Sequence, residues 1–141
     1  MKTLIIFLWI LTLLFSSVCY GQDINWIKTT HWKLYNIHDK AAFNYSVDTL
    51  QYFKNTPLDD STMHHFLKPV SLWPVEKYSL WMGLFVASFE TEDKRLQKII
   101  ISFYGGFFYD PLAKRYYELP EDERKAWYQY INDSAEKIVD K

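Results

Sequence analysis

Four histidines and two adjacent aspartates are the side chains of this 141-residue sequence best suited to acid–base or metal chemistry. They are His31, His38, His64, His65, Asp59 and Asp60. His64 and His65 would point about 100° apart on a helix, and neither HxxxH nor HExxH spacing occurs. A metal site would therefore need His31 or His38 to be brought in by the fold, with an aspartate as an oxygen ligand. We expect surface or partly packed histidines, and a small hydrolase or metal enzyme that uses His64 or His65 with Asp60 is the least favoured hypothesis.

Other catalytic patterns are missing from the sequence. Residues 22–141 contain no cysteine, and no serine stands in the GxSxG pattern that exposes a nucleophile. The two aspartates and the acidic cluster at residues 121–123 lie where helix N-termini favour negative charge. Gly105 and Gly106 are followed by two phenylalanines, not by the Lys-Ser/Thr of a phosphate-binding loop. We expect no catalytic residue, no metal site and no cofactor.

Aromatic side chains could act by stacking on a partner. The sequence contains 10 Phe, 11 Tyr and 6 Trp, and most of these rings are expected in the core, where they bury large apolar areas. The densest run covers residues 104–117, and a hairpin there would direct half of its side chains away from the core. We predict a binding surface that contains Tyr104, Phe108, Tyr109, Arg115 and Tyr117, with Trp81 from an earlier strand.

The amino-terminal residues have the pattern of a secretory signal peptide. A positive start at Lys2 is followed by residues 4–18, which are mostly apolar and carry no charge. As a helix this run would span about 22 Å, less than the roughly 30 Å of a bilayer's hydrocarbon core. We predict that residues 1–21 are cleaved before Gln22, with a cut before Tyr20 as the second choice. The protein would then be exported, and periplasmic or extracellular.

Two alternatives would keep the amino terminus at a membrane. One is a lipoprotein anchored through Cys19, disfavoured because the branched Val18 stands where a small residue is usual. The other is an uncleaved anchor. We expect membrane contact only if Cys19 is lipidated. Cleavage near Gly21 removes the only cysteine, so an exported domain would meet an oxidising compartment without a thiol.

The rest of the chain, residues 22–141, is predicted to be a single globular α+β domain, because it has no repeat, charge block or Gly/Ser linker. We expect an antiparallel β-meander of four to five strands, with two short helices and a C-terminal amphipathic helix packed on one face. The predicted strands are residues 31–37, 78–90, 96–104, 107–110 and 115–119, and the predicted helices are residues 46–53, 59–68 and 120–138.

Two details of this pattern bear on the layers of the fold. The strand over residues 78–90 is apolar at both alternating sets of positions, which predicts a central strand covered on both faces. Residues 69–74 begin and end with proline, which removes a backbone donor, so we expect an extended linker there and not a central strand.

These patterns favour a small exported, non-catalytic protein that binds another protein, as inhibitors, immunity proteins and envelope accessory factors do. The alternative is a glycan-binding module that uses Trp81, Tyr109 and Tyr117 as stacking platforms. The 16 Lys and Arg against 17 Asp and Glu leave no cationic surplus, so we expect no nucleic-acid partner.

Overall fold

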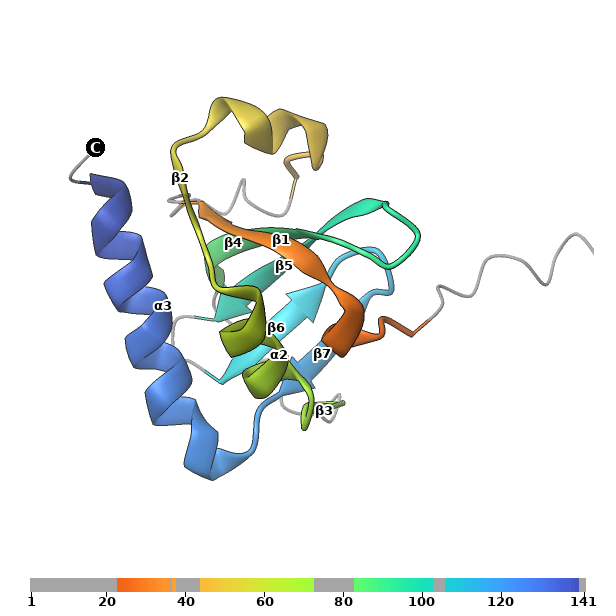
Figure 1. Ribbon diagram of the computed structural model, residues 1–141, viewed down its shortest axis with the longest axis vertical. Coiled ribbons are helices and arrows are strands. Elements are labelled where there is room, and N and C mark those ends of the chain that lie inside the picture. The colour runs from red at the N-terminus through yellow and green to blue at the C-terminus, as the bar shows by residue number, and fades with distance from the viewer. Residues whose placement is uncertain (1–22, 36, 38–43, 73–82, 103–105, 140–141) are drawn as a thin grey trace, which may run out of the picture.

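The structure, a computed structural model, describes residues 23–35, 37, 44–72, 83–102 and 106–139. Its strands are β1 (Thr30–Tyr35), β2 (Asn55–Pro57), β3 (Ser71–Leu72), β4 (Gly83–Glu90), β5 (Leu96–Ser102), β6 (Phe107–Asp110) and β7 (Arg115–Glu118). Its helices are the 3₁₀ turns η1 (Trp26–Lys28), η3 (Asp48–Tyr52) and η5 (Glu121–Glu123) and the α-helices α2 (Asp60–Leu67) and α3 (Arg124–Val139). Figure 1 shows α3 running beside the curved sheet and α2 lying against it.

The sheet is antiparallel, in the order β2-β1-β4-β5-β6-β7-β3, and confirms the predicted α+β class. Strands β4 to β7 form the expected meander. Within the described residues the sheet has seven strands and not four to five, because β2 and β3 extend its two edges. These strands have three and two residues, too short for an alternating pattern to be visible in the sequence. Strand β3 lies in the predicted linker, where it pairs with β7.

One face of the sheet, which we call the helical face, packs against α2, α3 and η1. Its buried residues include Trp32, Phe85, Phe89, Ile99, Ile101 and Phe108 from the strands and Met63, Leu67, Trp127, Ile131 and Ile138 from the helices. The predicted helix starts are confirmed at both α-helices. The Asp59 side chain accepts the Thr62 N–H at 2.7 Å, and α3 follows Pro120 and the acidic turn η5. Hydrogen bonds from Thr62 also hold the pKa of Asp59 below its ordinary value.

The opposite face, which we call the second face, has a smaller core formed by Tyr35, Ile37, Leu50 and Val86. Val86 contributes to this core while Phe85 and Phe89 contribute to the helical one, so β4 is covered on both faces, as predicted.

The first predicted helix packs on this second face and not beside α2 and α3, and it is a 3₁₀ helix. Val47, Leu50 and Phe53 recur at intervals of three, which is the period of a 3₁₀ helix and not of an α-helix. Beyond it, β2 separates η3 from α2, so the two helices do not follow one another directly.

Among the described residues, no helix combines the length and the apolar character needed to cross a membrane.

Candidate binding surface

The β6–β7 hairpin carries most of the predicted binding residues, and its turn is built from its own sequence. The buried Asp110 carboxylate accepts the backbone N–H of Leu112 at 2.9 Å and of Ala113 at 3.2 Å. Lys114 closes the turn with φ 54°. Burial raises the pKa of Asp110, and the two backbone N–H groups oppose that rise. The turn fixes which residues of β6 and β7 face each other.

Two of the predicted binding residues, Phe108 and Tyr117, lie on the helical face, which corrects the expectation that their rings form a surface. Phe108 is 0% exposed and Tyr117 is 8% exposed. The two rings stack with centroids 5.1 Å apart, and Trp26 meets both edge-on at 5.4 and 5.6 Å. Removing Tyr117 would therefore damage the core, so substitution there is not a test of binding that leaves the fold intact.

The outward side of the hairpin carries the other aromatic rings. Tyr109 and Tyr116 face each other across the strands with ring centroids 4.5 Å apart, and both are half-buried. Leu112 in the turn is 64% exposed. We call Tyr109, Tyr116 and Leu112 the tyrosine surface.

A cation from α3 lies at the base of the hairpin. The Arg124 guanidinium lies 4.7 Å from the centre of the Phe107 ring and donates to the Leu119 carbonyl at 2.9 Å. Its ion pair with Glu118, at 3.4 Å, ties the start of the helix to β7. Arg124 therefore connects α3 to the ends of β6 and β7 that lie opposite the hairpin turn.

Arg115 is held by neighbours on its own side of the hairpin. It forms an ion pair with Asp23, and hydrogen bonds to the Tyr117 hydroxyl and to Asp23 raise its pKa. Its charge is thus already paired. Trp81 and Tyr104, the remaining predicted binding residues, lie outside the described residues.

The described histidines each have a structural partner. His64 Nε2 lies 2.5 Å from the Thr29 carbonyl oxygen, and His65 Nε2 lies 3.5 Å from a Glu123 carboxylate oxygen. His31 Nδ1 lies 3.3 Å from a Glu90 carboxylate oxygen. No three His, Cys, Asp or Glu side chains in the described part of the chain are grouped as metal ligands would be. His38 lies outside it.

Asp60 has a role that the sequence did not indicate. Its carboxylate accepts the backbone N–H groups of His31 at 3.1 Å and of Trp32 at 3.2 Å. These two residues lie in the register shift of β1, where His31 has φ 56° and the ladder to β4 is interrupted. Asp60 thus provides hydrogen-bond acceptors for two backbone N–H groups at the irregular part of β1.

Gln97 is a second residue whose importance was missed. It alternates along β5 with Ile99 and Ile101, which belong to the helical core, yet it is polar and 8% exposed. A single amide side chain in this otherwise apolar alternating series is the sequence feature that could have drawn attention to Gln97. The carboxamide oxygen has no hydrogen-bond partner.

Searches with this chain found no matching protein-family model, no similar curated protein and no similar solved structure.

Proposed function

We propose that the protein is an exported, non-catalytic binding protein that recognises another protein through the tyrosine surface. The carrying observation is the pair of half-buried rings of Tyr109 and Tyr116, whose strands are joined by a turn that exposes Leu112. Aromatic side chains on a rigid strand pair bury much area in a complex while few rotatable bonds become fixed. The exposed Lys114 can contribute a charged rim contact.

On β7, the proposed recognition residue is Tyr116 and not its neighbour Tyr117, which the sequence had suggested. Phe108 and Tyr117 are buried in the core and Arg115 is paired with Asp23, and the proposal assigns recognition to the half-buried Tyr109 and Tyr116. The rings belong to two antiparallel strands with a fixed register, so their spacing is set before a partner arrives.

Export is part of the proposal, and only the sequence of residues 1–21 supports it. Mass spectrometry of the protein recovered from its native host is the direct measurement. A mature chain that begins at Gln22 supports export with cleavage, a lipid-modified Cys19 supports the anchored form, and a chain that retains Met1 in the cytoplasm contradicts export.

Recognition is tested with the double variant Tyr109→Ala/Tyr116→Ala and the matched control Tyr128→Ala, an exposed tyrosine on α3. We expect the wild type and the control to retain one specific partner from the compartment in which the protein resides. The double variant should lose it while keeping a native circular-dichroism spectrum. Normal partner capture by the folded double variant would contradict the proposal.

The glycan-binding alternative keeps Tyr109 as a platform and loses the buried Tyr117. It differs from protein recognition in one measurable respect. Titration with wall and host polysaccharides should leave the resonances of Tyr109 and Tyr116 unchanged if the partner is a protein. Saturable shifts of these two residues with a polysaccharide would favour the alternative.

A further inference from the structure

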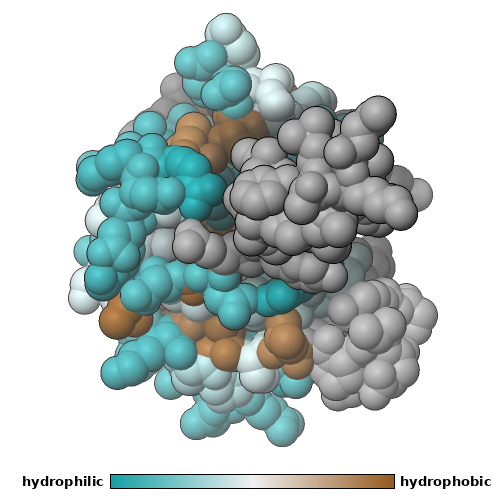
Figure 2. Space-filling view, turned by 90° about the vertical axis from the view of Figure 1, so that its right-hand side faces the viewer, coloured by the Kyte–Doolittle hydropathy of each residue, from teal (hydrophilic) through white to brown (hydrophobic). Residues whose placement is uncertain are grey.

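A groove of about 230 Å³ lies on the second face of the sheet, beside η3. Side chains of β1 and β4 form its floor, η3 forms one wall, and Leu96 at the start of β5 lies at one end. The groove is therefore close to the base of the β4–β5 turn. Figure 2 shows the side of the molecule that carries this turn, where the described residues are mostly hydrophilic.

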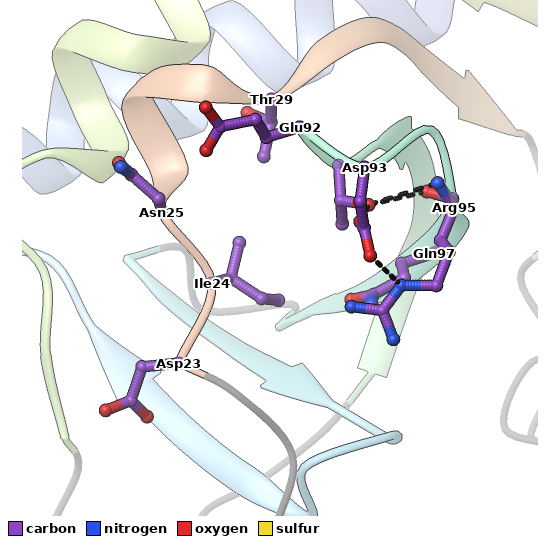
Figure 3. Close-up of a pocket in the computed structure, with 9 residues that line it drawn as sticks. Asp23, Ile24, Asn25, Thr29, Glu92, Asp93, Arg95 and Gln97 are labelled. Atoms are coloured by element: carbon purple, nitrogen blue, oxygen red, sulfur yellow. Dashed lines mark hydrogen bonds and ion pairs between the residues drawn. The ribbon is translucent and has the colours of Figure 1, made fainter.

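A larger cavity, of about 330 Å³, lies between the same turn and residues 23–29, which Figure 3 shows facing each other. Three carboxylates line that cavity, and each of them is already paired with a cation. The pairs are Asp23 with Arg115, Glu92 with Lys28 and Asp93 with Arg95. Among its described lining residues, the larger cavity therefore offers no free charge to a ligand.

The groove differs, because two of its charged side chains are free. Lys33 on β1 and Asp48 on η3 line the groove, and both are exposed. Within the described part of the chain, neither side chain has a hydrogen-bond or ion-pair partner, and the exposed Gln51 of η3 has none either. The groove thus presents accessible donors and acceptors, with one free charge of each sign.

His31 also lines the groove, and its backbone is strained. It has φ 56°, and the ladder between β1 and β4 shifts register at this residue. Asp60 holds this conformation by accepting the His31 N–H at 3.1 Å, and the imidazole Nδ1 lies 3.3 Å from Glu90 Oε2. Residues with strained backbone cluster at ligand-binding sites, where the surrounding contacts maintain them. A strained histidine beside a groove is therefore a second indication of a ligand.

One part of the groove is apolar. Leu96 is 47% exposed, and Val47 is half-buried. Contact with a ligand would remove apolar surface of Leu96 from water, which is favourable. The buried hydroxyl groups of Tyr35 and Ser88 in the floor bond to each other at 3.0 Å, so they shape the groove without needing a ligand.

These features together select a neutral ring that carries several hydroxyl groups. The free charges of Lys33 and Asp48 cancel, so the groove favours neither an anion nor a cation. A hydroxyl group both donates and accepts, so hydroxyl groups can serve the ammonium, the carboxylate and the Gln51 amide. The volume is below the range of about 300–1,000 Å³ typical of sites for drug-sized ligands, which favours a single ring.

We propose that this groove binds one neutral sugar ring, whose hydroxyl groups bond to Lys33 and Asp48 and whose C–H groups pack on Leu96. The ring can be a free monosaccharide or the terminal unit of a glycan. The proposal is independent of the tyrosine surface, because none of the three residues of that surface lines the groove.

The test titrates the ¹⁵N-labelled full chain with the methyl glycosides of glucose, galactose and mannose and follows the backbone amide resonances. Cyclohexanol has a ring with one hydroxyl group, and glycine has both charges without a ring. We expect at least one glycoside to cause saturable shifts in residues 31–33, 47–51 and 88–96 below about 100 mM, and the other two probes to bind at least about tenfold more weakly. No saturable shift in these residues with any glycoside, or equal or tighter binding of cyclohexanol or glycine, would overturn the proposal. This comparison needs no variant.

Two variants test the free charges. Lys33→Met removes the ammonium group and keeps an unbranched side chain, and Asp48→Asn removes the charge at a similar size. Both residues are exposed, so we expect the fold to be kept and the affinity for the glycoside to fall at least about tenfold in each variant. Lys54→Met, at an exposed position outside the groove, is the control and should bind normally. Unchanged affinity in either folded variant would contradict the proposal.

The variant His31→Gly separates a binding role from a structural one. Glycine adopts a positive φ without strain, so the urea midpoint should stay the same or rise. The affinity for the glycoside should fall at least about tenfold, because the imidazole is lost from the groove. A lower midpoint with unchanged affinity would show that the strained residue serves only the fold, which would contradict the proposal.

A last arm distinguishes the two sources of the ring. It uses a disaccharide that carries the best-bound ring at its non-reducing end. Affinity equal to or above that of the monosaccharide supports a glycan terminus as the natural ligand, and lower affinity supports a free monosaccharide. Binding of neither molecule overturns the proposal.

Discussion

Neighbouring tyrosines of β7 offer a direct test of which side of the hairpin faces the core. Tyr117 is 8% exposed, stacks on Phe108 and meets Trp26 edge-on. Replacing a buried aromatic residue with alanine costs about 3–5 kcal/mol, because apolar contacts are lost and a cavity remains. Tyr116 is half-buried, and its ring lies 4.5 Å from that of Tyr109 between centroids. An aromatic pair contributes about 0.5–1.5 kcal/mol beyond its buried area, so Tyr116→Ala should cost about 1–2 kcal/mol.

Equilibrium urea unfolding of Tyr116→Ala and Tyr117→Ala measures this difference. Both variants change the same residue type, so their denaturant slopes should agree. A difference of about 2 kcal/mol would separate the two midpoints by about 1 M at a slope of about 2 kcal/mol/M. Similar losses, or a larger loss for Tyr116→Ala, would refute the face assignment, because a slip of one residue exchanges every side chain between the two faces.

The Tyr117 hydroxyl adds a second readout of the same assignment. Burial raises the pKa of Tyr117 above its ordinary value of 10.0, so the folded protein favours the neutral phenol. The free energy of unfolding should therefore fall as the pH rises above about 10, where the unfolded chain ionises first. Tyr117→Phe should remove this component of the loss, whereas Tyr116→Phe should retain it. Equal alkaline profiles for the two variants would contradict the predicted burial.

Three further substitutions test other parts of the structure by urea unfolding. Gly106→Ala should destabilise the protein by about 2–4 kcal/mol, because the residue has φ 73° and the new Cβ would lie 2.4 Å from Arg124 Cγ; a neutral effect would exclude this close approach. Trp127→Phe should cost less than about 2 kcal/mol despite complete burial, because Nε1 has no hydrogen-bond partner to lose; a cost above about 3 kcal/mol would imply such a partner. Asp110→Asn should stabilise the protein at pH 7, because burial raises the pKa of Asp110 and its charge then opposes folding. That gain should disappear below about pH 3.8, where the wild-type carboxyl is protonated in both states, and a gain that persists there would contradict the pKa direction.

Elements specified by nearby residues could be predicted from the sequence. The Asp59 cap, the start of α3 after Pro120 and the β4–β5 hairpin each depend on residues within one turn or one strand. The interval of three in η3 was also visible and predicts a helix, and the structure shows that this helix is of the 3₁₀ type. Local chemistry thus predicted the presence and order of most elements.

Interactions between distant residues could not be predicted in this way. Asp60 bonds to backbone groups of β1 that lie 28 and 29 residues away, and only the packing of α2 on the sheet brings them together. The polarity of Gln97 was visible, but its unpaired oxygen depends on where residues 23–29 fold back. The partners of such groups are set by tertiary structure and not by the chain around them.

The binding surface shows how one residue of register changes a functional conclusion. In β6 the hydrophobic pattern alone favours burial of Phe107 and Tyr109, because the alternate set contains the charged Asp110. The ladder decides otherwise, since Phe108 is opposite Ile101 of the helical core and thereby takes Asp110 inward with it. The two N–H groups of the turn that this carboxylate accepts offset part of the cost of its burial. Burial of one acid by its own turn therefore leaves the Tyr109–Tyr116 pair on the outward side, where we propose that recognition takes place.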